Sequence, residues 1–278
     1  MDAAIGPPST HRPRTIAFTS GKGGVGKSSL VLNMGLALAH RGQRLAILDG
    51  DFGAGSLNVL LGLSPRFDLR HVVAGERRLA DTVVRGPHGI GVIAAGPAVG
   101  ELLNRDDGAR RRILAQLSEV AVDCLLIDTG AGVSETVLSL VQAADEAVVV
   151  TRPEPTALAG AYSLVKAVIA RTTSYPFRLL VNMVRDADEA RRTYDCLSEI
   201  LVRLLAYRPG YAGHVPTDPQ VMQAAIEQVP FLVNAPGCPA SLAVSALAAE
   251  MLGSRAALCE RVAAPLPAPM SPREAQPV

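Results

Sequence analysis

Aromatic residues and an excess of one charge are both scarce in this chain of 278 residues. Tryptophan is absent and aromatic residues make up only 4 %, so the core has to be built from aliphatic side chains. Lysine and arginine (27) nearly equal aspartate and glutamate (26), so the overall charge gives no reason to expect a polyanionic partner. Hydrophobic residues make up 49 %, which is enough for a large core and excludes a disordered chain.

Long apolar runs and a targeting segment are also missing. No run reaches the ~18 residues that are needed to cross a bilayer. The sequence begins MDAAIGPP, with neither a basic stretch nor an apolar stretch, so we expect no secretory signal. These two features predict a cytoplasmic protein.

The cysteines and histidines lack the spacing of metal ligands. No two cysteines form a C-x-x-C pair, and the five histidines are scattered along the chain. We therefore expect reduced, mostly buried thiols and no metal site built from side chains alone. The cysteines are Cys124, Cys196, Cys238 and Cys259.

Short and long apolar segments alternate along the chain. The short runs predict buried parallel strands at residues 15–19, 44–48, 91–94, 123–127, 147–151 and 178–181. The longer periodic segments predict helices at residues 27–40, 109–120, 134–142, 156–170 and 187–205. This alternation predicts one doubly wound α/β domain over residues 14–253, with a mostly parallel sheet and helices on both faces. Residues 1–13 are expected to form a disordered arm, and residues 254–278 a short helix or a disordered Pro-rich tail.

The first predicted strand leads into the octapeptide GKGGVGKS, which matches the phosphate-loop pattern G-x-x-x-x-G-K-[ST]. Glycines let several backbone N–H groups converge on a phosphate, and the next helix offers its positive N-terminal end. Lys27 is expected to reach the β- and γ-phosphates, and Ser28 to ligate Mg²⁺. A Gly-rich turn without a ligand is the alternative, which the flanking strand and helix disfavour. The predicted binding residues are Gly21, Gly23, Gly24, Val25, Gly26, Lys27, Ser28 and Ser29.

A second lysine, Lys22, lies inside the same loop. Two like charges this close repel each other, and a polyphosphate between them would offset that cost. Lys22 is therefore either a solvated lysine at the tip of the loop or a cation that reaches the phosphate of a facing subunit.

Two further predicted strands end in carboxylates. Asp49 and Asp51 follow the strand at 44–48, and Asp128 follows the strand at 123–127. Ligands bind at the carboxyl edge of a parallel sheet, where carboxylates can hold the waters of Mg²⁺ or orient an attacking water. We therefore predict a metal site of Ser28, Asp49, Asp51 and Asp128. A tight turn is expected at residues 129–132, where the backbone can sense a γ-phosphate. An aspartate that only forms a turn is the alternative, and it is less favoured for a pair.

The base pocket has one candidate from the residues alone. Asn182 ends a predicted strand, and an amide can both donate to and accept from adenine. A capping asparagine is the alternative. Guanine stays open as a base, although no N-K-x-D motif is present.

The loop GKGGVGKS resembles the deviant Walker A loop of the MinD/ParA family of dimeric ATPases. The resemblance extends over nearly the whole predicted domain. It implies a doubly wound fold, ATP and Mg²⁺ as ligands, and a homodimer that forms with ATP. It also implies that Lys22 acts across the dimer, on the nucleotide that Lys27 of the partner subunit holds. Asp51 is implied to position the attacking water, and Asp128 to contact the metal through water.

The same resemblance bears on the base and on the biological role. It implies adenine contacts from Asn182 and from the chain around Pro216 and Asp218. The segments DFG at 51–53, NVLLGL at 58–63 and DTGAGVSETVLS at 128–139 are similar to the FlhG (FleN) branch, which regulates flagellar number or placement. The implied partners are an FlhF-type GTPase, flagellar switch proteins or a flagellar transcription activator. The D-Q-A-x-x-L motif that activates the GTPase is missing, so stimulation of that partner is not expected.

Membrane and DNA contacts have weaker support. Residues 240–252 predict the last core helix, and residues 254–263 offer only a short stripe without Trp or Phe, so peripheral binding at the inner membrane is weakly indicated. Arginines in the predicted helix at 187–205 are interleaved with acids, which predicts a salt-bridged surface and argues against direct DNA binding. The sequence thus predicts a slow, partner-stimulated switch ATPase. The alternatives are a partition-type ATPase on the nucleoid and a nucleotide-binding scaffold without turnover.

Overall fold

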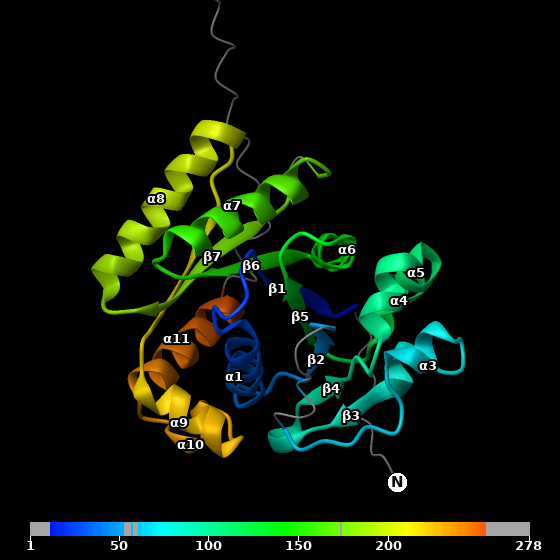
Figure 1. The fold of residues 1–278 in the computed structure, drawn as a ribbon. Helices are drawn as coiled ribbons and strands as arrows, with labels where there is room; N and C mark the ends of the chain where they lie inside the picture. The colour runs from blue at the N-terminus through cyan, green and yellow to red at the C-terminus, as the bar shows by residue number, and fades with distance from the viewer. Residues whose placement is uncertain (1–11, 53–56, 58–60, 173, 254–278) are drawn as a thin grey trace, which may run out of the picture.

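A computed structural model describes residues 12–52, 57, 61–172 and 174–253 of the chain. Its centre is an eight-stranded sheet in the order β3-β4-β2-β5-β1-β6-β7-β8, parallel throughout except that β3 runs antiparallel to β4 (Figure 1). The strands are β1 (Arg14–Ser20), β2 (Leu45–Gly50), β3 (Val83–Arg85), β4 (Gly91–Ile93), β5 (Cys124–Ala131), β6 (Glu146–Thr151), β7 (Phe177–Val184) and β8 (Gly210–Pro216).

Helices cover both faces of this sheet. One face carries α1, α9, α10 and α11, and the other carries α3 to α8 (Figure 1). The α-helices are α1 (Lys27–Ala39), α3 (Leu69–Val73), α4 (Val99–Arg105), α5 (Asp107–Ala115), α6 (Glu135–Ala143), α7 (Pro155–Ile169), α8 (Ala187–Leu205), α9 (Pro219–Glu227), α10 (Phe231–Asn234) and α11 (Pro239–Gly253). Three 3₁₀ helices are η1 (Leu79–Thr82), η2 (Pro87–Gly89) and η3 (Leu117–Glu119). The prediction of a doubly wound, mostly parallel α/β fold is confirmed.

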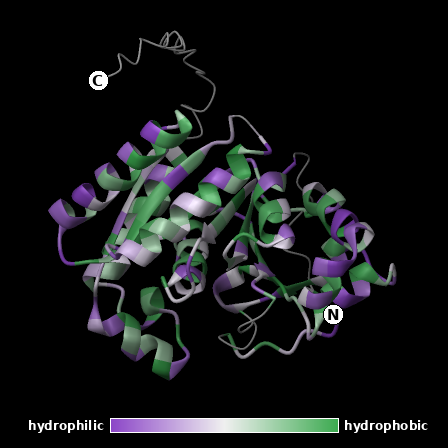
Figure 2. Ribbon diagram, turned by 45° about the horizontal axis from the view of Figure 1, so that its top comes forward, coloured by the Kyte–Doolittle hydropathy of each residue, from purple (hydrophilic) through white to green (hydrophobic). Residues whose placement is uncertain are grey.

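The central strands are apolar along their length because both of their faces are buried. In β1, Ile16 and Phe18 join the core on the face that α1 and α11 cover, whereas Ala17 between them joins the core on the opposite face. Successive side chains of a strand point to opposite faces, so a strand covered on both sides needs apolar residues at every position. Figure 2 shows these hydrophobic strands in the interior and hydrophilic residues on the outer helices.

Two predicted elements were wrong in extent. The single helix expected at 109–120 is α5 followed by η3, with Asp106 capping α5 by accepting the N–H groups of Gly108 at 2.8 Å and Ala109 at 3.1 Å. The tight turn expected at 129–132 begins later, because β5 runs on to Ala131. Its residues stay in the sheet, where Thr129 lies opposite Gly50 and its hydroxyl contacts that of Thr19 at 3.0 Å.

The remaining predictions concern the last helix and the two ends of the chain. Helix α11 buries Val244, Leu247 and Met251, which confirms that the helix predicted at 240–252 belongs to the core. Residues 1–11 and 254–278, and with them most of the predicted arm and the predicted tail, lie outside the described residues. Within the described part of the chain, no helix has the length and apolarity needed to span a bilayer.

Candidate functional site

The loop between β1 and α1 forms a cleft at the carboxyl edge of the sheet. Gly24 (φ +76°) and Gly26 (φ +82°) adopt left-handed conformations, which a glycine reaches without strain. Gly26 is also the N-cap of α1 and has no side chain to accept the first N–H groups of the helix, so these can bind an anion. The cleft has a volume of ≈ 210 Å³ and is lined by Ser20, Gly23, Gly24, Val25, Gly26, Lys27, Ser28, Ser29, Asp51 and Ala131.

Lys27 lies between two carboxylates at the floor of this cleft. Its Nζ is 2.5 Å from Oδ1 of Asp128 and 3.8 Å from Oδ2 of Asp51. Lys27 and Asp128 are both buried. Burial raises the pKa of Asp128 above its ordinary value, and the adjacent Lys27 ammonium and Ser28 hydroxyl oppose that rise. The sheet register places the acid here, because Asp128 on β5 lies opposite Phe18 on β1.

The donors around the cleft fit a magnesium nucleotide. Mg²⁺ prefers hard oxygen ligands, and Ser28, Asp51 and Asp128 supply a hydroxyl and carboxylates. Phosphate oxygens need N–H donors and a cation, which the first turn of α1 and Lys27 supply. Ser20 also lines the cleft, and its hydroxyl is buried without a hydrogen-bond partner among the described residues. Such an unsatisfied group is costly unless a ligand or water pairs with it.

The two aspartates after β2 differ in their surroundings. Asp51 is partly exposed and lines the cleft. Asp49 is fully buried, does not line the cleft, and accepts the backbone N–H groups of Leu57 at 2.9 Å and Asp51 at 3.3 Å. Burial raises the pKa of Asp49 to about 7, and the two N–H donors oppose the shift. The structure therefore brings Asp51 into the cleft, whereas it places Asp49 behind the cleft as an anchor for the chain after β2.

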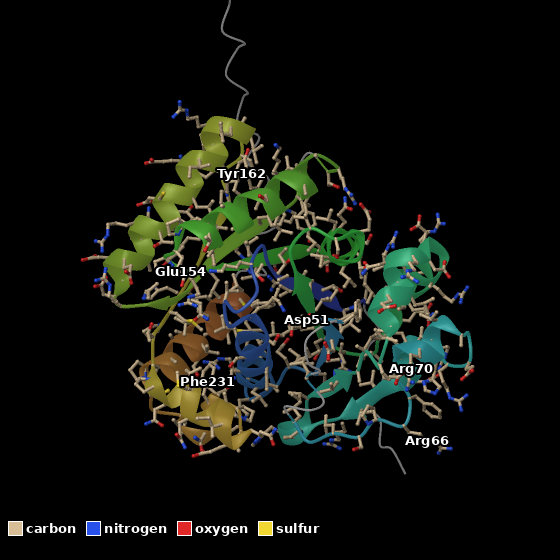
Figure 3. All side chains as sticks on the ribbon, viewed as in Figure 1. Asp51, Arg66, Arg70, Glu154, Tyr162 and Phe231 are labelled. Carbon is tan, nitrogen blue, oxygen red and sulfur yellow. The ribbon has the colours of Figure 1, made fainter. Side chains whose placement is uncertain are left out.

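Lys22 points away from the cleft of its own chain. Its Nζ is 2.9 Å from Oε2 of Glu154 and 2.9 Å from Oγ1 of Thr156 at the start of α7. The hydrogen bond from Lys22 lowers the pKa of Glu154. The Lys22 side chain stays 42 % exposed, so it remains accessible to a second molecule. Figure 3 labels Glu154 and Asp51, which lie in that view on either side of the loop that leads into α1.

The start of α7 was not predicted as part of the site. The backbones of Gly21 and Gly160 touch: a Cβ on Gly21 would lie 1.9 Å from the carbonyl carbon of Gly160, and a Cβ on Gly160 would lie 2.8 Å from that of Gly21. Both positions therefore need glycine, and together they fix the loop against α7. Three residues of this region were not predicted: Glu154, Thr156 and Gly160. They follow β6, which pairs with β1, so they lie at the same sheet edge as the phosphate loop, and this position was the available signal.

The predicted adenine-binding residues lie on two neighbouring strand ends. Asn182 on β7 is buried, and its Nδ2 donates to the carbonyl oxygen of Val25 at 2.8 Å, so it supports the loop. Met183, which follows it, has a left-handed backbone (φ +57°), an uncommon conformation that is often found at functional sites. Pro216 ends β8, and Asp218 caps α9 by accepting the N–H of Gln220 at 2.9 Å. Asp218 also accepts the N–H of Ala240 at 3.1 Å.

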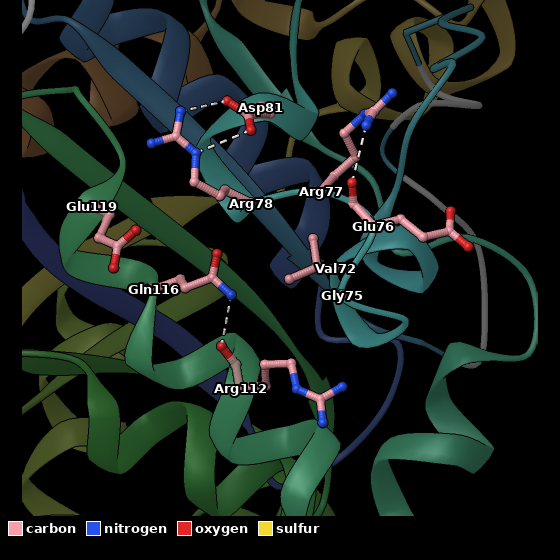
Figure 4. A pocket seen from close by; sticks show the side chains of 9 residues that line it. All are labelled: Val72, Gly75, Glu76, Arg77, Arg78, Asp81, Arg112, Gln116 and Glu119. Carbon is pink, nitrogen blue, oxygen red and sulfur yellow. Dashed lines mark hydrogen bonds and ion pairs between the residues drawn. The ribbon is translucent and has the colours of Figure 1, made fainter.

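A second cavity, of ≈ 450 Å³, lies apart from this site and contains none of the predicted residues (Figure 4). Its three arginines are balanced by three carboxylates, and Arg78 pairs with Asp81 at 2.9 Å. This balance gives it no clear preference for an anion or a cation. The lining residues are Val72, Gly75, Glu76, Arg77, Arg78, Asp81, Arg112, Gln116 and Glu119.

The described cysteines do not gather into a metal centre. Cys124 and Cys238 are buried, Cys196 is exposed, and all three are free thiols, as predicted; Cys259 lies outside the described residues. Burial raises the pKa of Cys124 to about 12, which keeps it protonated and inert. Within the residues that the structure describes, no group of three His, Cys, Asp or Glu side chains is placed to hold a metal ion.

The sequence and the fold are both similar to those of known proteins. The ParA family model, described as "NUBPL iron-transfer P-loop NTPase", matches residues 12–252. The chain is 34 % identical to the antiactivator FleN of Pseudomonas aeruginosa over 245 residues, which cover 87 % of this chain and 88 % of that protein. It is 33 % identical to the flagellum site-determining protein YlxH of Helicobacter pylori over 190 residues, 66 % of this chain and 63 % of that one.

A solved structure carries the same fold. It is the septum site-determining protein MinD of Pyrococcus horikoshii complexed with Mg-ADP, with a TM-score of 0.72 and 21 % sequence identity. The match covers 90 % of this chain and all of that one (100 %).

Proposed function

The chain belongs to the ParA/MinD family of P-loop NTPases, and we propose that it is a slow ATPase that works as an ATP-dependent dimer switch. The observation that carries the proposal is the cleft in which Lys27 lies between Asp128 and Asp51 at the N-terminus of α1. Proteins of this family bind ATP with Mg²⁺, and the oxygen and N–H donors of the cleft suit both ligands.

Each residue of the cleft has a proposed role. Lys27 and the N–H groups of the first turn of α1 bind the phosphates, and Ser28 ligates the metal. Asp128 supports the metal through water, and Asp51, which faces the cleft, orients the attacking water. Mg²⁺ bound at these oxygens neutralises charge on the phosphates, and the protein contributes positioning and charge stabilisation. Asp49 acts as a positioning residue for the chain after β2.

We assign Lys22 to the cleft of a second subunit. In one protomer, Glu154 and Thr156 hold it outside its own cleft, although its charge suits a developing negative charge on a phosphate. An ATP-dependent homodimer brings the two loops face to face and supplies each cleft with the Lys22 of the partner. Partner proteins that favour or disfavour this dimer would set the turnover rate.

The role of the switch follows from the two flagellar relatives. One is named an antiactivator and the other a flagellum site-determining protein, so we infer that this chain regulates flagellar number or placement. The partner classes that suit this role are a flagellar transcription activator, flagellar switch proteins and an FlhF-type GTPase. Asn182, Pro216 and Asp218 are proposed to border the base.

The charge pattern of α8 disfavours a role on DNA. Two arginines there form ion pairs with acids of the helix: Arg191 pairs with Asp195 at 3.2 Å, and Arg185 just before the helix pairs with Glu189 at 2.8 Å. A DNA-binding face needs unpaired cations directed at phosphates. The segment predicted to offer a weak membrane contact, residues 254–263, lies outside the described part, so co-sedimentation of the full chain with anionic vesicles and ATP is the direct test.

The proposal is tested by assaying the full chain and two variants. Wild-type protein with Mg-ATP should release phosphate slowly and form a dimer on a sizing column. Lys27→Ala should lose nucleotide binding. Asp51→Ala should bind ATP, release no phosphate and accumulate as a dimer. Wild-type protein that binds ATP without releasing phosphate would indicate a scaffold, and an Asp51→Ala protein that stays monomeric with ATP would overturn the switch.

A further inference from the structure

Helix α9 exposes an apolar stripe beside the nucleotide cleft. Met222 is 72 % exposed and Ile226 is 71 % exposed, and the two lie one turn apart on the same face of the helix. Val229, one further turn along the chain, is also exposed. Ala224 is the one buried residue of α9 and Val221 is half-buried against the core, so the rest of the helix surface is open to solvent. Large apolar side chains exposed together mark an interaction surface.

The stripe continues from the cleft. Ser29 lines the nucleotide cleft and also a small hollow of ≈ 70 Å³ that lies between α1 and α9. That hollow is lined mainly by apolar residues, among them Leu32, Val221, Val229 and Phe231, which is labelled in Figure 3. Val229 thus joins the stripe to the hollow, and Ser29 joins the hollow to the cleft, so a molecule that covers both reaches the end of the stripe.

The helix is held in a fixed position toward the same edge. Asp218 caps its first turn and also binds the N–H of Ala240 at the start of α11. The preceding Thr217 donates its N–H to the carbonyl oxygen of Val184, at the carboxyl end of β7. These contacts anchor the N-terminal end of α9 to β7 and α11.

The composition of α9 favours a protein surface as its partner. The helix sequence PQVMQAAIE has a single charged residue, Glu227, and no lysine or arginine. An interfacial helix on an anionic membrane needs basic residues beside its apolar face, and a nucleic-acid surface needs them even more. A neutral apolar face fits the core of a protein–protein interface, which is depleted of charge and enriched in residues such as Met.

We infer that α9 docks onto a second copy of this chain and forms the apolar flank of the ATP-dependent dimer. The inference rests on the proposed function, because Lys22 of a second subunit has to enter the cleft, and the hollow beside α9 adjoins that cleft at Ser29. A two-fold dimer uses the same patch twice, so the stripes of both protomers flank the two clefts and are buried together. The side chains of Met222 and Ile226 are the anchors of this surface.

The test is the double variant Met222→Gln/Ile226→Gln in the full chain. The matched control is Leu204→Gln on α8, which is also exposed (58 %) but lies at the far end of α8, away from the carboxyl edge of the sheet. Nucleotide affinity is measured with a fluorescent ATP analogue, dimerisation by analytical ultracentrifugation with ATP in the Asp51→Ala background, and folding by melting temperature. We expect the double variant to bind nucleotide and melt as the parent does, with dimer affinity reduced at least tenfold, and Leu204→Gln to dimerise as the parent does.

The outcomes separate the inference from the proposed function. A parent protein that stays monomeric with ATP overturns the dimer switch and the inference with it. A parent that dimerises together with an equally dimeric double variant overturns the inference alone. Backbone amides of α9 that exchange equally fast in the monomer and in the ATP-bound dimer would overturn it as well.

Discussion

Lys22 forms an ion pair with Glu154 on the outer side of the phosphate loop, with Nζ 2.9 Å from Oε2. In an isolated protomer, the lysine that we assign to the partner's cleft is therefore bound to a residue of its own chain. Any trans contact has to compete with this pair, so Glu154 restrains the loop in the monomer.

Glu154→Gln should make dimerisation with ATP easier. Loss of the carboxylate charge frees Lys22, and exposed pairs of this kind usually shift an equilibrium by about two- to five-fold. We expect that tightening in the ATP-dependent dimer measured by analytical ultracentrifugation, and no dimer without ATP. Thr156→Val, which removes only a neutral partner of Lys22, is the control and should have a smaller effect. A weaker dimer from Glu154→Gln would mean that this carboxylate is needed in the dimer rather than in the monomer.

Gly160→Ala should damage the phosphate loop from outside it. A helical Gly→Ala change usually stabilises by roughly 0.5–1 kcal/mol. Here the new Cβ would lie 2.8 Å from the backbone of Gly21, so we expect a net loss of about 1–3 kcal/mol in the free energy of unfolding and weaker nucleotide binding. Urea unfolding and nucleotide titration measure the two effects. Ser163→Ala, on the exposed side of the same helix, should leave both unchanged, and a stabilised Gly160→Ala protein would refute the close contact.

The sequence was most informative where a residue's role depends on local pattern. The sequence predicted the phosphate loop, the doubly wound fold and the positions of Asp51 and Asp128. Each of these predictions needs only an apolar strand and the residues that follow it, because the carboxyl ends of parallel strands meet at one edge of the sheet. Helix α8 was predicted over its full extent because its apolar periodicity is a local signal.

The features that were not predicted depend on contacts between distant segments of the chain. Strand β8 was missed because it is an edge strand with a half-exposed surface and two glycines, Gly210 and Gly213, which weaken the strand pattern. Asp49 and Asp51 look equivalent in the sequence, but only the fold decides that one lines the cleft and the other is buried behind it. The partners of Lys22 lie more than 130 residues away along the chain, and no local spacing reveals them.

Asp49 should make folding stability depend on pH. Its pKa is about 7 in the folded protein because it is buried, and about 3.9 in an unfolded chain, so it ionises in the unfolded state first. Its contribution to stability is full below about pH 4 and is lost as the pH rises to about 7, at up to ~1.4 kcal/mol per pH unit. Urea unfolding between pH 5 and 8 should show the wild type losing stability relative to Asp49→Asn across this window. Parallel curves for the two proteins would mean that Asp49 stays ionised in the fold.

Removing one member of the Lys27–Asp128 ion pair should lower the free energy of unfolding more than the other single substitutions would. Lys27→Met removes the cation from a buried carboxylate and leaves that charge uncompensated, which typically costs about 3–5 kcal/mol. Burial already raises the pKa of Asp128, and without Lys27 the rise is larger. A carboxyl group with a raised folded pKa loses stability as the pH increases, so the variant should be less stable at pH 8 than at pH 6, by urea unfolding.

The double variant Lys27→Met/Asp128→Asn separates charge from packing. It removes both members of the pair, so it should recover much of the lost stability and the pH dependence should disappear, while nucleotide binding stays lost. Coupling between the two changes follows from the double-mutant cycle, and residues in direct contact typically show about 0.5–3 kcal/mol. If the single change Lys27→Met were as stable as the double variant at pH 8, Asp128 would have to be uncharged at that pH once Lys27 is removed. The charge of Asp128 in the wild-type cleft would then depend on its ion pair with Lys27, and so would any contribution of Asp128 to binding a magnesium ion.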